Sequence, residues 1–183
     1  MGQFTFTKTK IDGAQVIEPR RYGDDRGYFM ETYNYDDFAA NGIEAQFIQD
    51  NQSKSIKGVL RGMHYQTRKP QSKLVRVIKG QVFDVAMDIR PESATYGQWE
   101  GVLLTDDNFK QFFIPEGCAH GFLVLSDEAE FVYKCTDVYD PGFEGGLAYN
   151  DPFFNVDWPI PEGMTLILSD KDKIYEPFNK IIK

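Results

Sequence analysis

The stretch VLRGMHYQTRKPQSKLVRVIKGQVFDV, residues 59–85, alternates apolar and polar side chains in a way typical of half-buried β-strands. Four cations, Arg61, Arg68, Lys73 and Arg76, interrupt it. Strand interiors rarely hold cations unless these are paired or face a cavity. The stretch also contains one of the two histidines of the chain, so we interpret it as part of a functional site built on strands.

The rest of the chain continues this strand pattern. Aromatic residues make up 15% of the sequence, and Gly and Pro separate short alternating runs, as in all-β sandwiches and barrels. The predicted strands are 4–8, 15–18, 28–33, 45–50, 59–65, 74–79, 82–89, 97–104, 111–114, 121–125 and 131–138. One open sheet rarely carries so many strands, so we expect two packed sheets or a closed barrel.

One helix is predicted, over residues 34–40. Asn34 is its expected N-cap, Asp36 and Asp37 lie in the first turn, and Gly42 follows the end. The later segment 140–163 is too rich in Gly and Pro for regular strands and is predicted to be a long wrapping loop.

Length and composition limit the possible functions. The 183 residues suit a single domain, 1–183, with one core. The net charge of −8 argues against nucleic acid or an anionic membrane as partner, although a basic pocket for a small anion remains possible. With no apolar leader or spanning segment we expect a cytoplasmic protein, and therefore free thiols at Cys118 and Cys135.

His64 is the first candidate for catalysis. Strict alternation places it on the strand face opposite Arg61, unless Gly62 bulges the strand and resets the count. A hairpin between strands 59–65 and 74–79 would bring Arg61 and Lys73 close to His64. A histidine in that setting can act as a base if a carboxylate orients its ring.

The second histidine, His120, ends the pattern Pro115-x-Gly117-x-x-His120. This pattern resembles the second sequence motif of the cupins, which are small jelly-roll β-barrels. Metal-binding cupins use a His-x-His pair, a Glu and a later His, whereas this chain has His64-Tyr65-Gln66 at the corresponding place. Two histidines cannot supply a three-His site, so we expect no metal and no other cofactor.

A narrower resemblance covers most of the chain. The blocks that carry it are GDDRGYFMETYN (23–34), FIQDNQSKSIKGVLRGMHYQ (47–66), KLVRVIKGQVFDVAMDIR (73–90), YGQW (96–99), FFIPEGCAHGFLVLSD (112–127), EFVYKCTDVYDP (130–141) and LSDKD (168–172). In this order they resemble the dTDP-4-dehydrorhamnose 3,5-epimerases, which are metal-free cupins. The resemblance implies a jelly-roll barrel with a few short helices and an irregular C-terminal segment.

The resemblance also implies a reaction. Members of the family invert C3 and C5 of dTDP-4-dehydro-6-deoxy-D-glucose through an enolate, in the dTDP-L-rhamnose pathway of cell-surface polysaccharide synthesis. By similarity His64 is the base, Asp172 orients its ring, Tyr133 is the acid and Lys73 stabilises the enolate oxygen.

Further roles follow from the same resemblance. His120 would contact the substrate near the reacting centre with Asp84 as its partner, although Asp88 offers the same chemistry four residues later. Other matched positions would bind the nucleotide, the diphosphate or the sugar: Arg26, Phe29, Glu31, Gln49, Asp50, Asn51, Arg61, Glu144 and Lys171. In the family the block 23–34 reaches the other subunit, which implies a homodimer with a shared active site.

Two alternatives remain open. One is an epimerase of the same mechanism that inverts C3 only or C5 only. The other is a non-catalytic cupin that binds a nucleotide sugar, but binding alone does not require a base opposite an acid.

Overall fold

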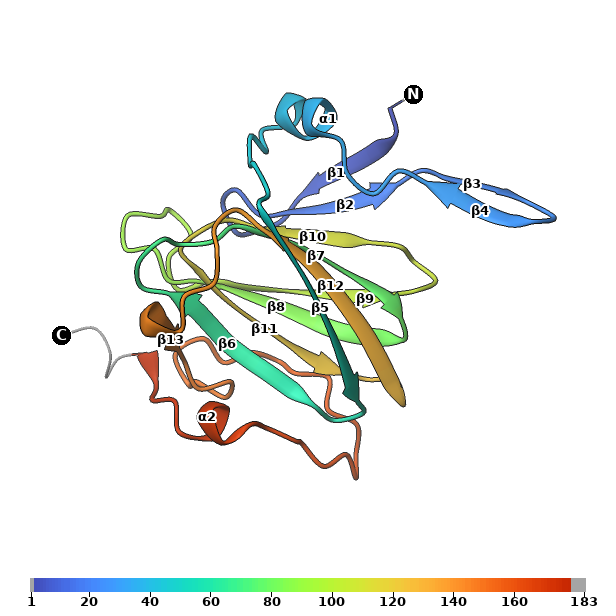
Figure 1. The fold of residues 1–183 in the computed structure, drawn as a ribbon. Helices are drawn as coiled ribbons and strands as arrows, with labels where there is room; N and C mark the ends of the chain where they lie inside the picture. Colours follow the sequence, from blue (N-terminus) through green and yellow to red (C-terminus); the bar gives the residue numbers. More distant parts are fainter. Residues whose placement is uncertain (1, 179–183) are drawn as a thin grey trace.

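The computed structural model describes residues 2–178 as two packed β-sheets with a projecting hairpin (Figure 1). The first sheet, in the order β1-β2-β10-β7-β12-β5, consists of β1 (Phe4–Lys8), β2 (Gln15–Pro19), β10 (Gln111–Ile114), β7 (Lys73–Lys79), β12 (Glu128–Cys135) and β5 (Gln49–Ile56). The second, in the order β13-β6-β11-β8-β9, consists of β13 (Glu144–Gly146), β6 (Leu60–Gln66), β11 (Cys118–Val124), β8 (Gln81–Asp88) and β9 (Trp99–Thr105). The hairpin consists of β3 (Arg21–Asp24) and β4 (Gly27–Met30). The predicted all-β jelly-roll class is confirmed.

The core lies between the two large sheets. Val75 and Phe131 of the first sheet pack with Val82, Ala86 and other residues of the second sheet in one buried apolar cluster. Burial of such alternating apolar side chains supplies most of the driving force for this packing.

A second apolar layer explains why strands of the second sheet are apolar on both faces. Leu60, Met63 and Leu123 on its outer face pack against Phe154 and Trp158 of the C-terminal segment. The segment is mostly irregular and covers the sheet, as predicted for 140–163. The prediction that it holds no strand is wrong, because β13 lies within it and pairs with β6. The segment also contains a 3₁₀ turn, η1 (Pro141–Phe143), and a short helix, α2 (Asp170–Lys173).

Helix α1 (Tyr35–Ala40) confirms the helix prediction. The Asn34 Oδ1 accepts the backbone N–H groups of Asp36 and Asp37, at 3.1 and 3.3 Å. The helix buries Phe38 against the aromatic side chains of Phe4 and others on the outer side of the first sheet. None of the helices within residues 2–178 is long and apolar enough to cross a membrane.

The predicted hairpin between strands 59–65 and 74–79 is wrong. β6 pairs with β11 and β13, whereas β7 pairs with β10 and β12, so the two strands lie in different sheets. Residues 67–72 therefore connect one sheet to the other. Lys73 approaches His64 from the facing sheet and not from a neighbouring strand.

The prediction was also wrong about the strands between residues 20 and 56. The structure has β3, which was missed, ends β4 at Met30, and begins β5 only at Gln49. β5 has the polar sequence QDNQSKSI, so it lacks the apolar alternation by which strands are recognised. Gln49, Asn51 and Ser53 line a polar cavity, which is the physical reason for the missing signal.

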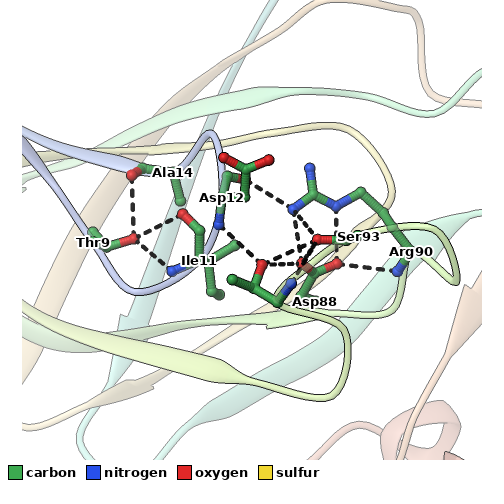
Figure 2. A network of polar contacts seen from close by, with 8 residues as sticks. Thr9, Ile11, Asp12, Ala14, Asp88, Arg90 and Ser93 are labelled. Atoms are coloured by element: carbon green, nitrogen blue, oxygen red, sulfur yellow. Dashed lines mark hydrogen bonds and ion pairs between the residues drawn. The ribbon is translucent and has the colours of Figure 1, made fainter.

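A buried polar network joins the end of β8 to the turn that follows it and to the β1–β2 connection (Figure 2). The Asp88 carboxylate accepts hydrogen bonds from Arg90, Ser93 and Thr95, with distances of 2.6 to 2.8 Å. Arg90 also donates to the backbone carbonyl of Asp12 at 2.8 Å. Burial raises the pKa of Asp88, but these hydrogen bonds outweigh it and hold the pKa well below its usual range.

Replacing Asp88 by asparagine is expected to lower the free energy of unfolding by about 2–4 kcal/mol at pH 7, because Arg90 loses its anion. Because the pKa of Asp88 is lower in the folded protein than in the unfolded chain, the ionised carboxylate stabilises the fold at pH values above about 3.9, which is its pKa in the unfolded chain. This stabilisation is lost as the pH falls through the pKa of Asp88 in the folded protein. The difference from wild type should therefore shrink below about pH 4 in urea titrations. The control is Asp127→Asn, since the Asp127 side chain is fully exposed. A difference that does not change with pH would contradict the assignment.

Candidate active site

A cavity of about 310 Å³ opens between the two sheets. Its volume is at the lower end of the range for small-molecule sites. Strands β5, β7 and β12 of the first sheet and β6 and β11 of the second contribute to its wall, together with residues near η1 and α2. The predicted site residues that line it are Gln49, Asn51, Arg61, His64, Lys73, His120, Tyr133, Glu144 and Lys171.

A bulge in β6 points Arg61 and His64 into the same cavity. Arg61 is opposite Phe122 and His64 is opposite His120, so the register shifts by one residue between these pairs. Gly62 has φ +130°, and a Cβ built on it would lie 2.5 Å from the Cα of Gly121. Only glycine fits there. The bulge at Gly62, which the sequence allowed as an alternative, is present, so the side chains of β6 do not alternate strictly between its two faces.

His64 forms a close pair with a carboxylate far away in the sequence. Its Nε2–H donates to the Asp172 Oδ1 at 2.6 Å, which leaves the ring Nδ1 with a free lone pair. Asp172 is almost fully buried, and its backbone N–H donates to the Ser169 Oγ that caps α2. Burial raises the pKa of Asp172, but hydrogen bonds from His64 and Ser169 and nearby positive charge hold it below the ordinary value. Asp172 is therefore an anion at neutral pH.

The second histidine has a carboxylate of its own. The His120 Nε2–H lies 2.9 and 3.1 Å from the two Asp84 carboxylate oxygens, and both side chains are buried. Burial lowers the pKa of His120, the Asp84 carboxylate opposes this, and Lys73 and His64 lower it further. Between the two candidates for its partner, the structure places Asp84 beside His120, whereas Asp88 belongs to the Arg90 network.

Tyr133 and Lys73 enter the cavity from the other sheet. Burial is the largest influence on both: it raises the pKa of Tyr133 and lowers the pKa of Lys73. The phenol therefore carries its proton at neutral pH. Negative charge at Asp84 and Glu144 opposes the effect of burial on Lys73. The cavity thus has two histidine–carboxylate pairs on one wall and a phenol and an amine on the facing wall.

Further cations and a carboxylate surround this centre. The Arg61 Nε–H donates to the Ser55 Oγ at 3.1 Å. The Glu144 carboxylate accepts from the Lys171 ammonium at 2.6 Å and from the Tyr139 hydroxyl at 2.9 Å. Burial raises the pKa of Glu144, but these two donors bring it below its ordinary value.

Six of the predicted residues do not line the cavity of this chain. Two of them, Asp84 and Asp172, are paired with its histidines, and the other four lie away from it. Arg26, Phe29 and Glu31 belong to the hairpin and the segment after it, and the hairpin projects away from the sheets (Figure 1). The Arg26 side chain is 90% exposed and pairs with Asp24 at 2.5 Å. Asp50 points to the outer side of β5, where it pairs with Lys134 at 3.0 Å.

Several cavity residues were not predicted. Ser53, Gln71, Cys135 and Tyr139 contribute to the wall. Cys135 is two residues after Tyr133 on the same strand, so alternation could have placed it in the cavity. No local sequence pattern marked Ser53, Gln71 or Tyr139 as cavity residues. Among residues 2–178 no group of three or more His, Cys, Asp or Glu side chains is arranged to hold a metal ion.

Comparison with known families gives one consistent result. Residues 8–180 match the model of the family described as dTDP-4-dehydrorhamnose 3,5-epimerase. The chain is similar to a dTDP-4-dehydrorhamnose 3,5-epimerase of Methanothermobacter thermautotrophicus, with 54% identity over 98% of this chain and 97% of the relative. A relative of the same description from Escherichia coli is 49% identical over 96% of this chain and 95% of its own length.

Solved structures agree with these relatives. A dTDP-6-deoxy-D-glucose-3,5-epimerase of Legionella pneumophila, in complex with dTDP-4-keto-L-rhamnose, has a TM-score of 0.93 and 49% identity, covering 97% of this chain and 94% of its own. A 3′-monoepimerase of Streptomyces bikiniensis in complex with dTDP-quinovose is less similar, with a TM-score of 0.85 and 30% identity, covering 92% and 85% of the two chains.

Proposed function

Because the chain belongs to the dTDP-4-dehydrorhamnose 3,5-epimerase family, we propose that the cavity between its two sheets is where the reaction of that family takes place. The protein is an isomerase that converts dTDP-4-dehydro-6-deoxy-D-glucose into dTDP-4-dehydro-L-rhamnose. The observation that carries the site assignment is the placement of a histidine–carboxylate pair and a half-buried phenol on facing walls of one cavity.

The chemistry explains why both walls are needed. The C4 carbonyl of the substrate acidifies the hydrogens on C3 and C5, so a base can remove either proton to form an enolate. Inversion then requires a proton donor on the opposite face of the sugar ring. A positive charge near the C4 oxygen stabilises the enolate.

His64 is the proposed base. Its Nε2–H donates to Asp172, so the lone pair of Nδ1 is available to the substrate. When the ring gains a proton, the Asp172 carboxylate stabilises the resulting imidazolium at 2.6 Å. Asp172 is therefore a positioning and stabilising residue for His64.

Tyr133 is the proposed acid and Lys73 the proposed electrophile. Tyr133 is protonated at neutral pH because burial raises the pKa of its phenol. Tyr133, on the first sheet, can deliver a proton to one face of the sugar ring after His64, on the second sheet, has removed a proton from the other face. Lys73 lies in the same wall as Tyr133, where its ammonium form would hold the enolate oxygen. His120, paired with Asp84, would donate or accept a hydrogen bond at the sugar.

The nucleotide end of the substrate requires cations and hydrogen-bond donors. Arg61 and Lys171 line the cavity and suit the diphosphate, since both can form charge-assisted hydrogen bonds to its oxygens. Lys171 is paired with Glu144 in this structure, so the diphosphate would share it with that carboxylate. Gln49 and Asn51 are the proposed contacts to the nucleoside.

We infer that the active molecule is a homodimer in which the hairpin of one subunit completes the cavity of the other. Tyr22, Tyr28 and Phe29 of the hairpin are 42, 57 and 70% exposed. Such aromatic groups usually find a partner at an interface. We further propose that residues 1–183 form one domain, that the protein is cytoplasmic and that its product serves cell-surface polysaccharide synthesis.

The reaction is tested by incubating the protein with dTDP-4-dehydro-6-deoxy-D-glucose in D₂O and following the sugar by NMR. Deuterium at both C3 and C5, with inversion at both, is the expected result. Label at one carbon alone would indicate a mono-epimerase. No label at either carbon would indicate a non-catalytic nucleotide-sugar-binding protein.

The shared site is tested by mixing two inactive variants, Arg26→Ala and His64→Ala. In a heterodimer of the two, one cavity combines an intact His64 with an intact Arg26 from the other subunit. Random mixing should therefore restore about a quarter of the wild-type sites, since half of the dimers are mixed and each has one intact site. No recovery after exchange of subunits would show that Arg26 does not act on the partner's cavity.

A further inference from the structure

A chain of hydrogen bonds runs along the nucleotide end of the cavity. The backbone N–H of Tyr139 donates to the Gln49 Oε1 at 2.9 Å. The Gln49 Nε2 donates to the Asn51 Oδ1 at 3.0 Å, and the Asn51 Nδ2 donates to the Cys135 Sγ at 3.7 Å, a distance that a sulfur acceptor allows. The side chains of Gln49, Asn51 and Cys135 all line the cavity.

The direction of this chain is fixed at its first member. A backbone N–H can only donate, so the atom of Gln49 that meets it must be the oxygen. The nitrogen of Gln49 then faces Asn51, whose oxygen must accept, and the nitrogen of Asn51 must face Cys135. Reversing either amide would place two donors or two acceptors against each other.

Cys135 is placed to end the chain as an acceptor. In the sheet it lies between Gln49 of β5 and Lys73 of β7, its direct partners on the two sides. Burial raises the pKa of the Cys135 thiol, although Lys73 and Asn51 oppose this, so the thiol remains neutral. Its sulfur lone pairs are thus available to Asn51.

We infer that Cys135 is a positioning residue for nucleotide binding, because its sulfur accepts the last N–H of a chain whose direction Tyr139 fixes and thereby holds the Asn51 amide in place, where this wall of the cavity forms a row of donors. With each amide nitrogen using one hydrogen within the chain, Gln49 and Asn51 each keep a second N–H for a ligand. Such a wall suits the carbonyl oxygens of a pyrimidine or the oxygens of a deoxyribose. This inference rests on the proposed function, since it concerns the nucleotide half of the same substrate.

A matched pair of substitutions tests the inference. Thr and Val have nearly the same shape, but only Thr offers an acceptor to Asn51. We expect Cys135→Thr to bind dTDP within about 2-fold of wild type and Cys135→Val to bind it about 3- to 10-fold more weakly, the equivalent of one modest hydrogen bond. In the steady state the loss should appear in KM, with kcat nearly unchanged.

The measurements are calorimetric titration with dTDP, kinetics with the full substrate and the thermal midpoint of each variant. Equal dTDP affinity of the Thr and Val variants would overturn the inference. A Val variant with normal dTDP binding but a reduced kcat would also overturn it, because that result would assign Cys135 to Lys73 and the reacting sugar. Failure of the wild type to bind dTDP would overturn the proposed function and this inference with it.

Discussion

Replacing His64 by alanine is expected to abolish deuterium exchange at both C3 and C5, with a loss of about 10³-fold or more in each rate. Both protons depend on one base in the proposed mechanism. Among the described residues that line the cavity, only His120 also pairs its Nε2 with a carboxylate, Asp84. Burial, Lys73 and His64 lower the pKa of His120, so it is a weaker base than an ordinary histidine.

The His64 experiment needs a control for folding and for binding. His64→Gln places an amide N–H at about the position of the ring Nε2, so it can still donate to the buried Asp172 carboxylate but has no basic nitrogen. Both variants should bind dTDP with near wild-type affinity, whereas neither should exchange either proton. Exchange retained at one carbon would show that a second group, with His120 the first to test, removes that proton.

Replacing Tyr133 by phenylalanine is expected to have the second large effect on activity. It should slow inversion without abolishing proton exchange, unlike the loss of His64. The substitution removes a hydroxyl group and leaves the ring that packs beside Phe131. Inversion should slow by about 10²- to 10⁴-fold, the usual contribution of a general acid. Proton removal by His64 should continue, so deuterium should enter C3 and C5 with retention of configuration and faster than the sugar inverts.

This separation of exchange from inversion is the decisive measurement for Tyr133. NMR in D₂O reports label and configuration in one experiment. Tyr65→Phe removes another phenol from the cavity wall and should change the rate by only a few fold. An inversion rate in Tyr133→Phe equal to that of wild type would show that water or another side chain supplies the proton.

Local patterns in the sequence predicted a large part of the fold. Strands 4–8, 111–114 and 74–79 are found within one residue of their predicted bounds, and Asn34 caps α1 as expected. These elements share a simple property: their side chains alternate or repeat against an apolar core, and this leaves a period in the sequence. β5 does not share it, because its inward face meets a polar cavity, and it was misplaced.

The site was predicted less from patterns than from the resemblance to a family. Strict alternation in β6 placed Arg61 and His64 on opposite faces, and the hairpin that was wrongly predicted put Lys73 on a neighbouring strand. Both inferences assumed regular local geometry. The bulge at Gly62 and the crossing from one sheet to the other at residues 67–72 changed the geometry, while the residues remained those of the site.

By itself the sequence determined the fold class, the family and the chemical groups available: two histidines, their carboxylates, a phenol and several cations. Only the tertiary structure decided which groups meet. His64 and Asp172 are 108 residues apart and 2.6 Å from each other, Asp84 and not Asp88 reaches His120, and Cys135 closes a hydrogen-bonded chain that begins at Tyr139. The physical reason is that the spacing of apolar side chains along a segment indicates only which of its faces is buried. These contacts depend instead on how strands that are distant in the chain pair with one another.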